Sequence, residues 1–124
     1  MFAEQQTQLQ TYQDAYQRTQ NTTETPRQTE YRLFAQVTRA LIESTKQDFK
    51  EKAKALNWNR RLWMTLQADC AKDDNALPDE IRAGIISLAI WVDKHSRKVS
   101  QGEADIVALV EVNRAIMDGL VSNP

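Results

Sequence analysis

The stretch that decides the fold is residues 56–70, LNWNRRLWMTLQADC. Its apolar residues recur every three or four positions, which is the spacing of one face of an α-helix. Trp63 lies on this apolar stripe, and so does the polar Asn59. The same period returns in residues 81–99 and again in residues 106–120. The sequence therefore predicts an all-α fold, a compact bundle of about four to five helices.

Length, charge and cysteine content restrict the class of protein. The 124 residues fit a single helical domain, residues 1–124, with 16 basic and 17 acidic residues and a net charge of −1. Domains that bind nucleic acid are usually basic. A single cysteine, Cys70, excludes an internal disulfide and suits a reducing compartment, and no apolar run approaches the ~20 residues of a membrane span. We expect a cytoplasmic protein that binds no membrane and does not contact nucleic acid directly.

The first 24 residues differ from the rest of the chain, because seven of them are Gln and large apolar side chains are few. Leu9, Tyr12 and Tyr16 share one helical face, which predicts a marginal amphipathic helix. Short isolated helices are weak in water and need a docking surface. We therefore treat residues 1–24 as a weakly held part of the same domain.

Capping residues mark several helix ends. Thr25-Pro26 predicts a helix start, because Thr can cap, Pro suits the first helical position and Gln28 completes a capping box. Pro78 predicts another start in the same way, and Gly102 predicts the end of that helix.

Two boundaries depend on weaker signals. Residues 26–71 can form one long helix or two, and we place a break near residues 50–57, where the apolar spacing is weakest, with the next helix over about 57–71. We expect the last helix to run from about Glu103 to Gly119 or Leu120.

No catalytic or metal-binding constellation stands out. Cys70 and His95 are the only thiol and imidazole of the chain, and metal sites need several clustered ligands. Cys70 has the spacing of a small core residue, and His95 lies in a basic helix end. We expect no enzymatic activity, no cofactor and no metal.

Trp and Arg dominate the energetics of protein interfaces and so mark candidate contact residues. The candidate partner-binding residues are Asn59, Arg60, Arg61, Trp63, Trp91, Asn113 and Arg114. Two interpretations stay open for those on the apolar stripes. Trp63 can pack in the core or anchor a partner, and the two Asn side chains can join neighbouring helices or set the register of an incoming helix.

The segment 46–61 is locally basic, with a net charge of +4. Trp58 lies within it and could stack on a base, so RNA binding is one interpretation. A solvated helix face is the other, because the lysines are spread around the predicted helix.

Four segments resemble the FlaF family of flagellar biosynthesis regulators from alphaproteobacteria. They are NRRLW at 59–63, NALPDEIRA at 75–83, ISLAIWV at 86–92 and EVNRAIMDGL at 111–120. Residues 15–16 and 25–30 are similar to the N-terminal part of the family, so the resemblance covers about residues 12–120.

This resemblance implies a cytoplasmic, non-enzymatic protein needed for flagellin production and export. It implies flagellin as a partner, bound in the manner of a secretion chaperone, and an FlbT-like regulator as a second partner. Two alternatives stay open: a post-transcriptional regulator of flagellin messenger RNA, acting directly or through the FlbT-like partner, and a structural helical dimerisation module. The oligomeric state is left open.

A chaperone would cover an amphipathic terminal segment of flagellin in a helical groove before export. We expect that groove between the helices at 57–71 and 78–100, with the helix at 104–120 as its floor. Trp63 and Trp91 would anchor the client, and residues 1–24 would occupy the groove when no client is bound.

Overall fold

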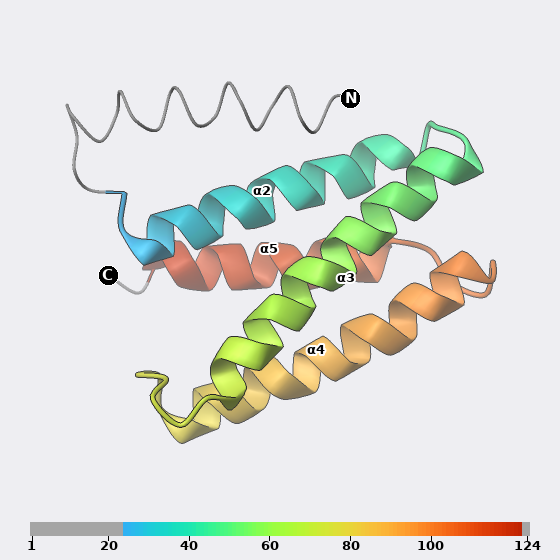
Figure 1. The fold of residues 1–124 in the computed structure, drawn as a ribbon. Helices are drawn as coiled ribbons and strands as arrows, with labels where there is room; N and C mark the ends of the chain where they lie inside the picture. The colour runs from blue at the N-terminus through green and yellow to red at the C-terminus, as the bar shows by residue number, and fades with distance from the viewer. Residues whose placement is uncertain (1–23, 123–124) are drawn as a thin grey trace.

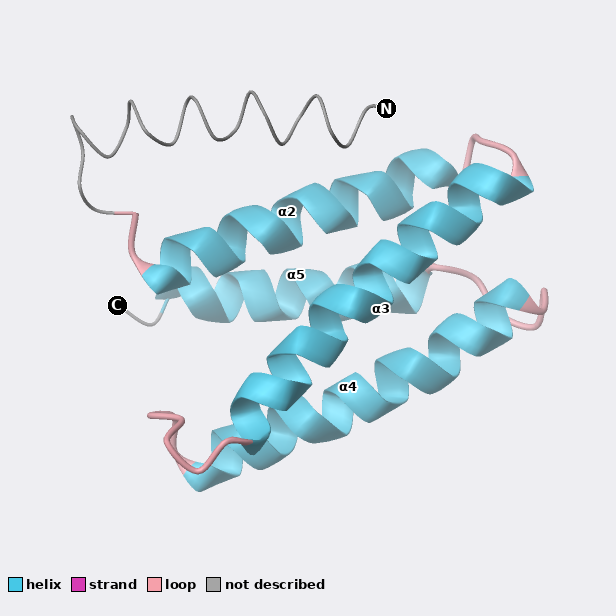
Figure 2. Ribbon diagram, viewed as in Figure 1, coloured by secondary structure: helices cyan, strands magenta, loops and turns pink. Residues whose placement is uncertain are grey.

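The computed structural model describes residues 24–122, and this part of the chain holds four helices and no strand (Figure 1, Figure 2). They are α2 (Pro26–Ser44), α3 (Phe49–Ala71), α4 (Asp79–Ser100) and α5 (Val107–Ser122). The predicted all-α bundle is confirmed. The weak helix predicted near the N-terminus falls on residues 1–23, outside the described part. Within the described part no helix has the length and apolar character needed to cross a membrane.

The predicted start of α2 is confirmed. Thr25 Oγ1 accepts the backbone N–H of Gln28 at 3.1 Å, and Gln28 Oε1 accepts the backbone N–H of Thr25 at 2.9 Å. Pro26 occupies the first helical position, where its missing N–H leaves no donor unpaired. This capping box determines where the chain enters the bundle.

Residues 26–71 form two helices, and the predicted position of the break was wrong. The break spans residues 45–48 rather than 50–57, so α3 begins at Phe49. Weak apolar spacing at 50–55 does not interrupt the helix, because residues 50–54 lie on the largely solvated first turn of α3, where few apolar contacts are required, and apolar packing begins at Ala55.

Local polar bonds set the break instead. Asp48 Oδ1 accepts the backbone N–H of Glu51 at 3.0 Å and so caps α3. The hydroxyls of Ser44 and Thr45 donate to the carbonyl groups three residues earlier, at 2.6 and 2.7 Å. Such side-chain to backbone bonds compete with continuation of a helix.

The connection from α4 to α5 contains one confirmed prediction and one correction. Gly102, with φ +76°, ends α4 as predicted, and the N–H of Glu103 reaches back to the Lys98 carbonyl at 2.8 Å, as in a Schellman motif. The last helix begins at Val107 rather than near Glu103. Its start follows Asp105, whose carboxylate accepts the Val107 N–H at 3.0 Å.

The helices pack as two antiparallel pairs, α2 with α5 and α3 with α4 (Figure 1). The pairs approach each other where α2 ends and α3 begins, which we call the closed end. They diverge toward the end that holds the start of α2, the turn at 72–78 and the last turns of α5, which we call the open end. Contact between α4 and α5 is slight, so little closes the bundle on that side.

The hydrophobic core joins the two pairs. Trp63 is 1% exposed and meets Phe34 edge-on, with ring centroids 5.5 Å apart and planes at 81°. The other buried apolar residues are Val37, Leu41, Ala55, Leu56, Cys70, Ala89, Val92, Leu109 and Val110. The core thus draws on all four helices.

Candidate functional site

Three of the seven predicted contact residues lie together in the core. Asn59, Trp63 and Asn113 are 0%, 1% and 0% exposed. Trp63 Nε1 donates to Asn113 Oδ1 at 2.9 Å, and Asn113 Nδ2 donates to Asn59 Oδ1 at 2.8 Å and to Thr38 Oγ1 at 3.1 Å. This polar cluster joins α2, α3 and α5. In this conformation none of the three offers a surface to a partner.

One donor of the polar cluster has no partner. Asn59 Nδ2 is buried and forms no hydrogen bond with any described residue. A buried unpaired donor costs free energy, so the cluster is stabilised mainly through Asn113, which makes three bonds where Asn59 makes one.

The other four predicted contact residues do not form one surface with these three. Arg60 is held by Asp93 of α4 at 2.8 Å, and Trp91 is partly buried and stacks on His95 with centroids 4.8 Å apart. Arg61 on α3 and Arg114 on α5 are exposed. The structure therefore divides the predicted set between the core and separate parts of the surface.

Cys70 and His95 have structural surroundings. Cys70 is 1% exposed, which confirms its predicted core position, and burial raises the pKa of its thiol. His95 is partly buried, and its Nε2 lies 3.0 Å from the carbonyl oxygen of Asp105. Among residues 24–122 no three His, Cys, Asp or Glu side chains are grouped so as to hold a metal ion.

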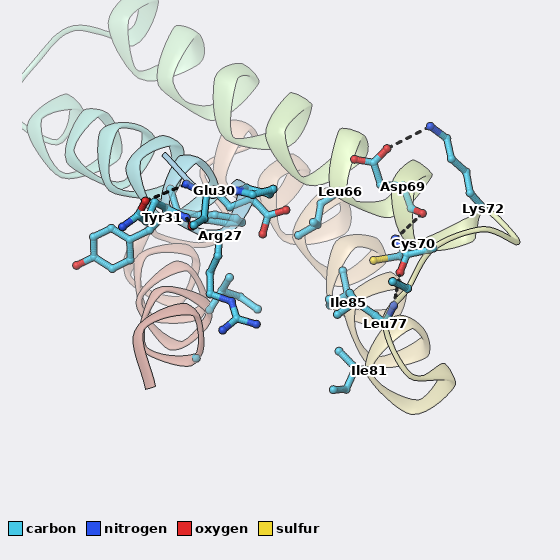
Figure 3. Close-up of a pocket in the computed structure, with 18 of the residues that line it drawn as sticks. Arg27, Glu30, Tyr31, Leu66, Asp69, Cys70, Lys72, Leu77, Ile81 and Ile85 are labelled. Atoms are coloured by element: carbon cyan, nitrogen blue, oxygen red, sulfur yellow. Dashed lines mark hydrogen bonds and ion pairs between the residues drawn. The ribbon is translucent and has the colours of Figure 1, made fainter. Parts of the chain in front are cut away.

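A groove with a volume of about 1340 Å³ lies at the open end (Figure 3). Parts of all four helices border it. Its large apolar lining residues are Tyr31, Phe34, Leu66, Leu77, Ile81, Ile85 and Ile116. Its charged lining consists of Arg27, Glu30, Asp69, Lys72 and Asp74. The groove therefore combines an apolar surface with a polar rim.

Two features shape this groove. One is the angle between the helix pairs, and the other is a pair of hydrogen bonds from Arg82 of α4 to the end of α3. Arg82 donates from Nε to the Cys70 carbonyl and from Nη2 to the Lys72 carbonyl, each at 2.8 Å. These bonds satisfy carbonyl groups at the end of α3 that no helical N–H can reach. They also connect the end of α3 to the start of α4, which together form one wall of the groove.

Two carboxylates lie on opposite sides of the groove. Figure 3 shows Glu30 on the α2 side and Asp69 on the α3 side, with Leu66 between them. Glu30 keeps contact with solvent, but partial burial of its carboxyl raises the pKa, and the negative charge of Asp69 raises it further. The Arg27 guanidinium acts in the opposite direction with the smallest of the three effects.

The groove coincides only in part with the predicted one. Residues of α3, α4 and α5 border it as predicted, but residues of α2 do so as well, and neither Trp63 nor Trp91 is among its lining residues. Ile81 and Ile85 were recognised as part of an apolar stripe, yet Ile81 remains 45% exposed at the groove. The segment 75–83, singled out by resemblance, was the available signal, since Leu77 and Ile81 both belong to it.

Comparison with known proteins agrees with the motifs described above. Neither the curated proteins nor the solved structures contain a match to this chain. The model of the family described as flagellar protein FlaF matches residues 12–120, which is most of the chain and includes all four described helices except the end of α5. The protein therefore belongs to the FlaF family of flagellar proteins.

Proposed function

We propose that this flagellar protein binds flagellin as a chaperone-like export factor and holds an amphipathic helical segment of it in the groove at the open end. The observation that carries this proposal is an exposed apolar surface inside the groove. Leu77 and Ile81 are 40% and 45% exposed there, although both are large apolar side chains. Contiguous apolar surface that stays exposed commonly marks a site for a protein partner.

The size of the groove favours a helix over a small molecule. Small-molecule sites usually measure about 300–1,000 Å³ and enclose most of their ligand. The groove is larger than that and open to solvent along the divergence of the two helix pairs. A helix that lays its apolar face into such a groove is a recurring mode of peptide recognition.

A matched pair of substitutions on α4 tests the proposal. Ile81 and Ile90 are the same residue type on the same helix and are 45% and 46% exposed, but Ile81 borders the groove and Ile90 does not. We expect Ile81→Glu to weaken flagellin binding by tenfold or more and Ile90→Glu to leave it unchanged. Titration of labelled flagellin monomer against each variant, with folding checked by circular dichroism, measures this. No binding of flagellin by the wild-type protein would refute the proposal.

Regulation of flagellin messenger RNA is the second candidate function, favoured by Trp58, which is 44% exposed in the basic segment 46–61. Two cations of that segment are already paired, Lys54 with Glu51 and Arg60 with Asp93. Direct phosphate contacts lose affinity steeply with salt. A binding isotherm for flagellin messenger RNA at two salt concentrations, with and without an FlbT-like protein, separates a direct role from one through that partner.

A further inference from the structure

The charges at the groove are arranged unevenly across its two sides. Lys72 lies 3.4 Å from Asp69, but these side chains are 64% and 55% exposed, and exposed pairs of this kind contribute little. No Lys or Arg among the described side chains lies within ion-pair distance of the Glu30 carboxylate. The groove thus presents two carboxylates that the rest of the described chain neutralises poorly.

The carboxylates of Glu30 and Asp69 lie beside apolar surface, which limits the kind of group that can neutralise their charge. Leu66 lies between Glu30 and Asp69 in Figure 3, and Ile85 lies beside Leu66 on the same side of the groove. An apolar segment that covers these residues removes water from both carboxylates. A like-charged pair that loses water without gaining a cation opposes binding. A client that carries its own cation at this point avoids that cost.

We propose that the segment bound in the groove is an amphipathic helix that places a lysine or arginine beside its apolar face, between Glu30 and Asp69. This inference rests on the proposed function and specifies the chemistry of its client. The apolar face of the helix covers Leu66, Ile81 and Ile85, and its cation replaces the weak contribution of Lys72 to Asp69. Charge complementarity of this kind determines which partner is accepted and in which register.

The test uses the full chain and two synthetic amphipathic peptides. The peptides share one Leu- and Ile-rich face and differ only at its flank, which carries Lys in one and Glu in the other. Fluorescence anisotropy measures the Kd of each. We expect the Lys peptide to bind roughly tenfold more tightly, the change that corresponds to about 1.4 kcal/mol. Glu30→Lys should reverse the preference, and Glu111→Lys, an exposed position of α5 outside the groove, should keep it.

The outcomes distinguish this inference from the proposed chaperone function on which it rests. Equal affinity of both peptides for the wild-type protein overturns the charge preference. Flagellin binding that is sensitive to Ile81→Glu but not to Glu30→Lys leaves the chaperone proposal standing and overturns this one. A wild-type dimer that Ile81→Glu converts to a monomer in sedimentation assigns the groove to a second copy. This assignment overturns the proposal.

Discussion

Trp63 of α3 donates its indole N–H to the side-chain oxygen of Asn113 of α5 across 2.9 Å, although no Cα atom of α3 lies within 8 Å of one in α5. The two helices are diagonal in the bundle, and long side chains connect them where the backbones do not meet. Phe34 of α2 packs on the same indole ring. This connection holds the two helix pairs together at the inner limit of the groove, since Phe34 also lines it, and beyond this point the pairs diverge toward the open end.

Asn113 should matter more for stability than Asn59. Asn113→Leu leaves the Trp63 indole N–H and the Asn59 side-chain oxygen without partners. Each buried unpaired group costs about 1–3 kcal/mol, so we expect the free energy of unfolding to fall by roughly 2–5 kcal/mol. Asn59→Leu removes an amide that already has an unpaired donor, and Asn113 keeps its bond to Thr38. Its cost should stay below about 1.5 kcal/mol.

Urea unfolding followed by circular dichroism compares the two Leu variants, which have the same side-chain volume at the substituted positions. Equal losses of stability would contradict the central role assigned to Asn113.

The Asp48 carboxylate should determine where α3 begins. Asp48→Ala removes the acceptor of the Glu51 N–H, and we expect a loss of about 1 kcal/mol in the free energy of unfolding. Lys50→Ala, in the exposed first turn of the same helix, is the control and should change stability by less than about 0.5 kcal/mol. Chemical denaturation measures both. Indistinguishable variants would mean that the break between α2 and α3 does not depend on this cap.

We expect that an ammonium group in place of the Arg82 guanidinium will not maintain stability or flagellin affinity. A lysine cannot reproduce the fork that reaches the Cys70 and Lys72 carbonyls together. We expect Arg82→Lys to lower stability by roughly 1.5–2 kcal/mol, at the low end of the range for a hydrogen bond from a charged donor. Because these bonds connect two sides of one groove wall, flagellin affinity should fall as well. Arg97→Lys, at a pair that is 66% exposed on the arginine side, should change neither thermal stability nor affinity.

Glu30 should make the fold less stable as the pH rises. Its folded-state pKa is raised above the ordinary value of 4.5, chiefly by burial and then by Asp69. Below pH 4.5 Glu30 is mostly protonated in both the folded and the unfolded state, so it does not lower the free energy of unfolding. That free energy falls as the pH rises from 4.5 through the folded-state pKa. Glu30→Gln should match the wild type in acid and exceed it near neutral pH by less than about 1 kcal/mol, because the groove is open to solvent.

Thermal unfolding of wild type and Glu30→Gln across this pH range measures the difference. A difference that is constant with pH would show that ionisation of Glu30 is not the cause.

Helix content and capping were largely predictable because both depend on residues close together in the chain. The capping box of Thr25 and the glycine stop at Gly102 involve partners within a few positions. The start of α3 was misplaced for a related reason. Asp48 and Glu51 have the spacing of a capping pair, but the predicted break relied on the apolar pattern alone and did not use this polar signal.

The contact residues were less predictable because the same residue types serve cores and interfaces. Trp63 and Asn113 have the composition of an interface hot spot, and only their burial distinguishes the two roles. Ile81 and Ile90 illustrate the converse. They are equally exposed and, nine positions apart, lie on opposite faces of α4, and the packing of the other helices decides which face borders the groove.

By itself the sequence determined the all-α class, most helix ends and the FlaF family, since these follow from periodicity, local hydrogen bonding and short motifs. The tertiary structure decided which apolar residues stay exposed and which carboxylates face each other. Those features depend on the angle between the α2–α5 and α3–α4 pairs. That angle arises from side chains of distant residues packing around Trp63, and no local pattern in the chain encodes it.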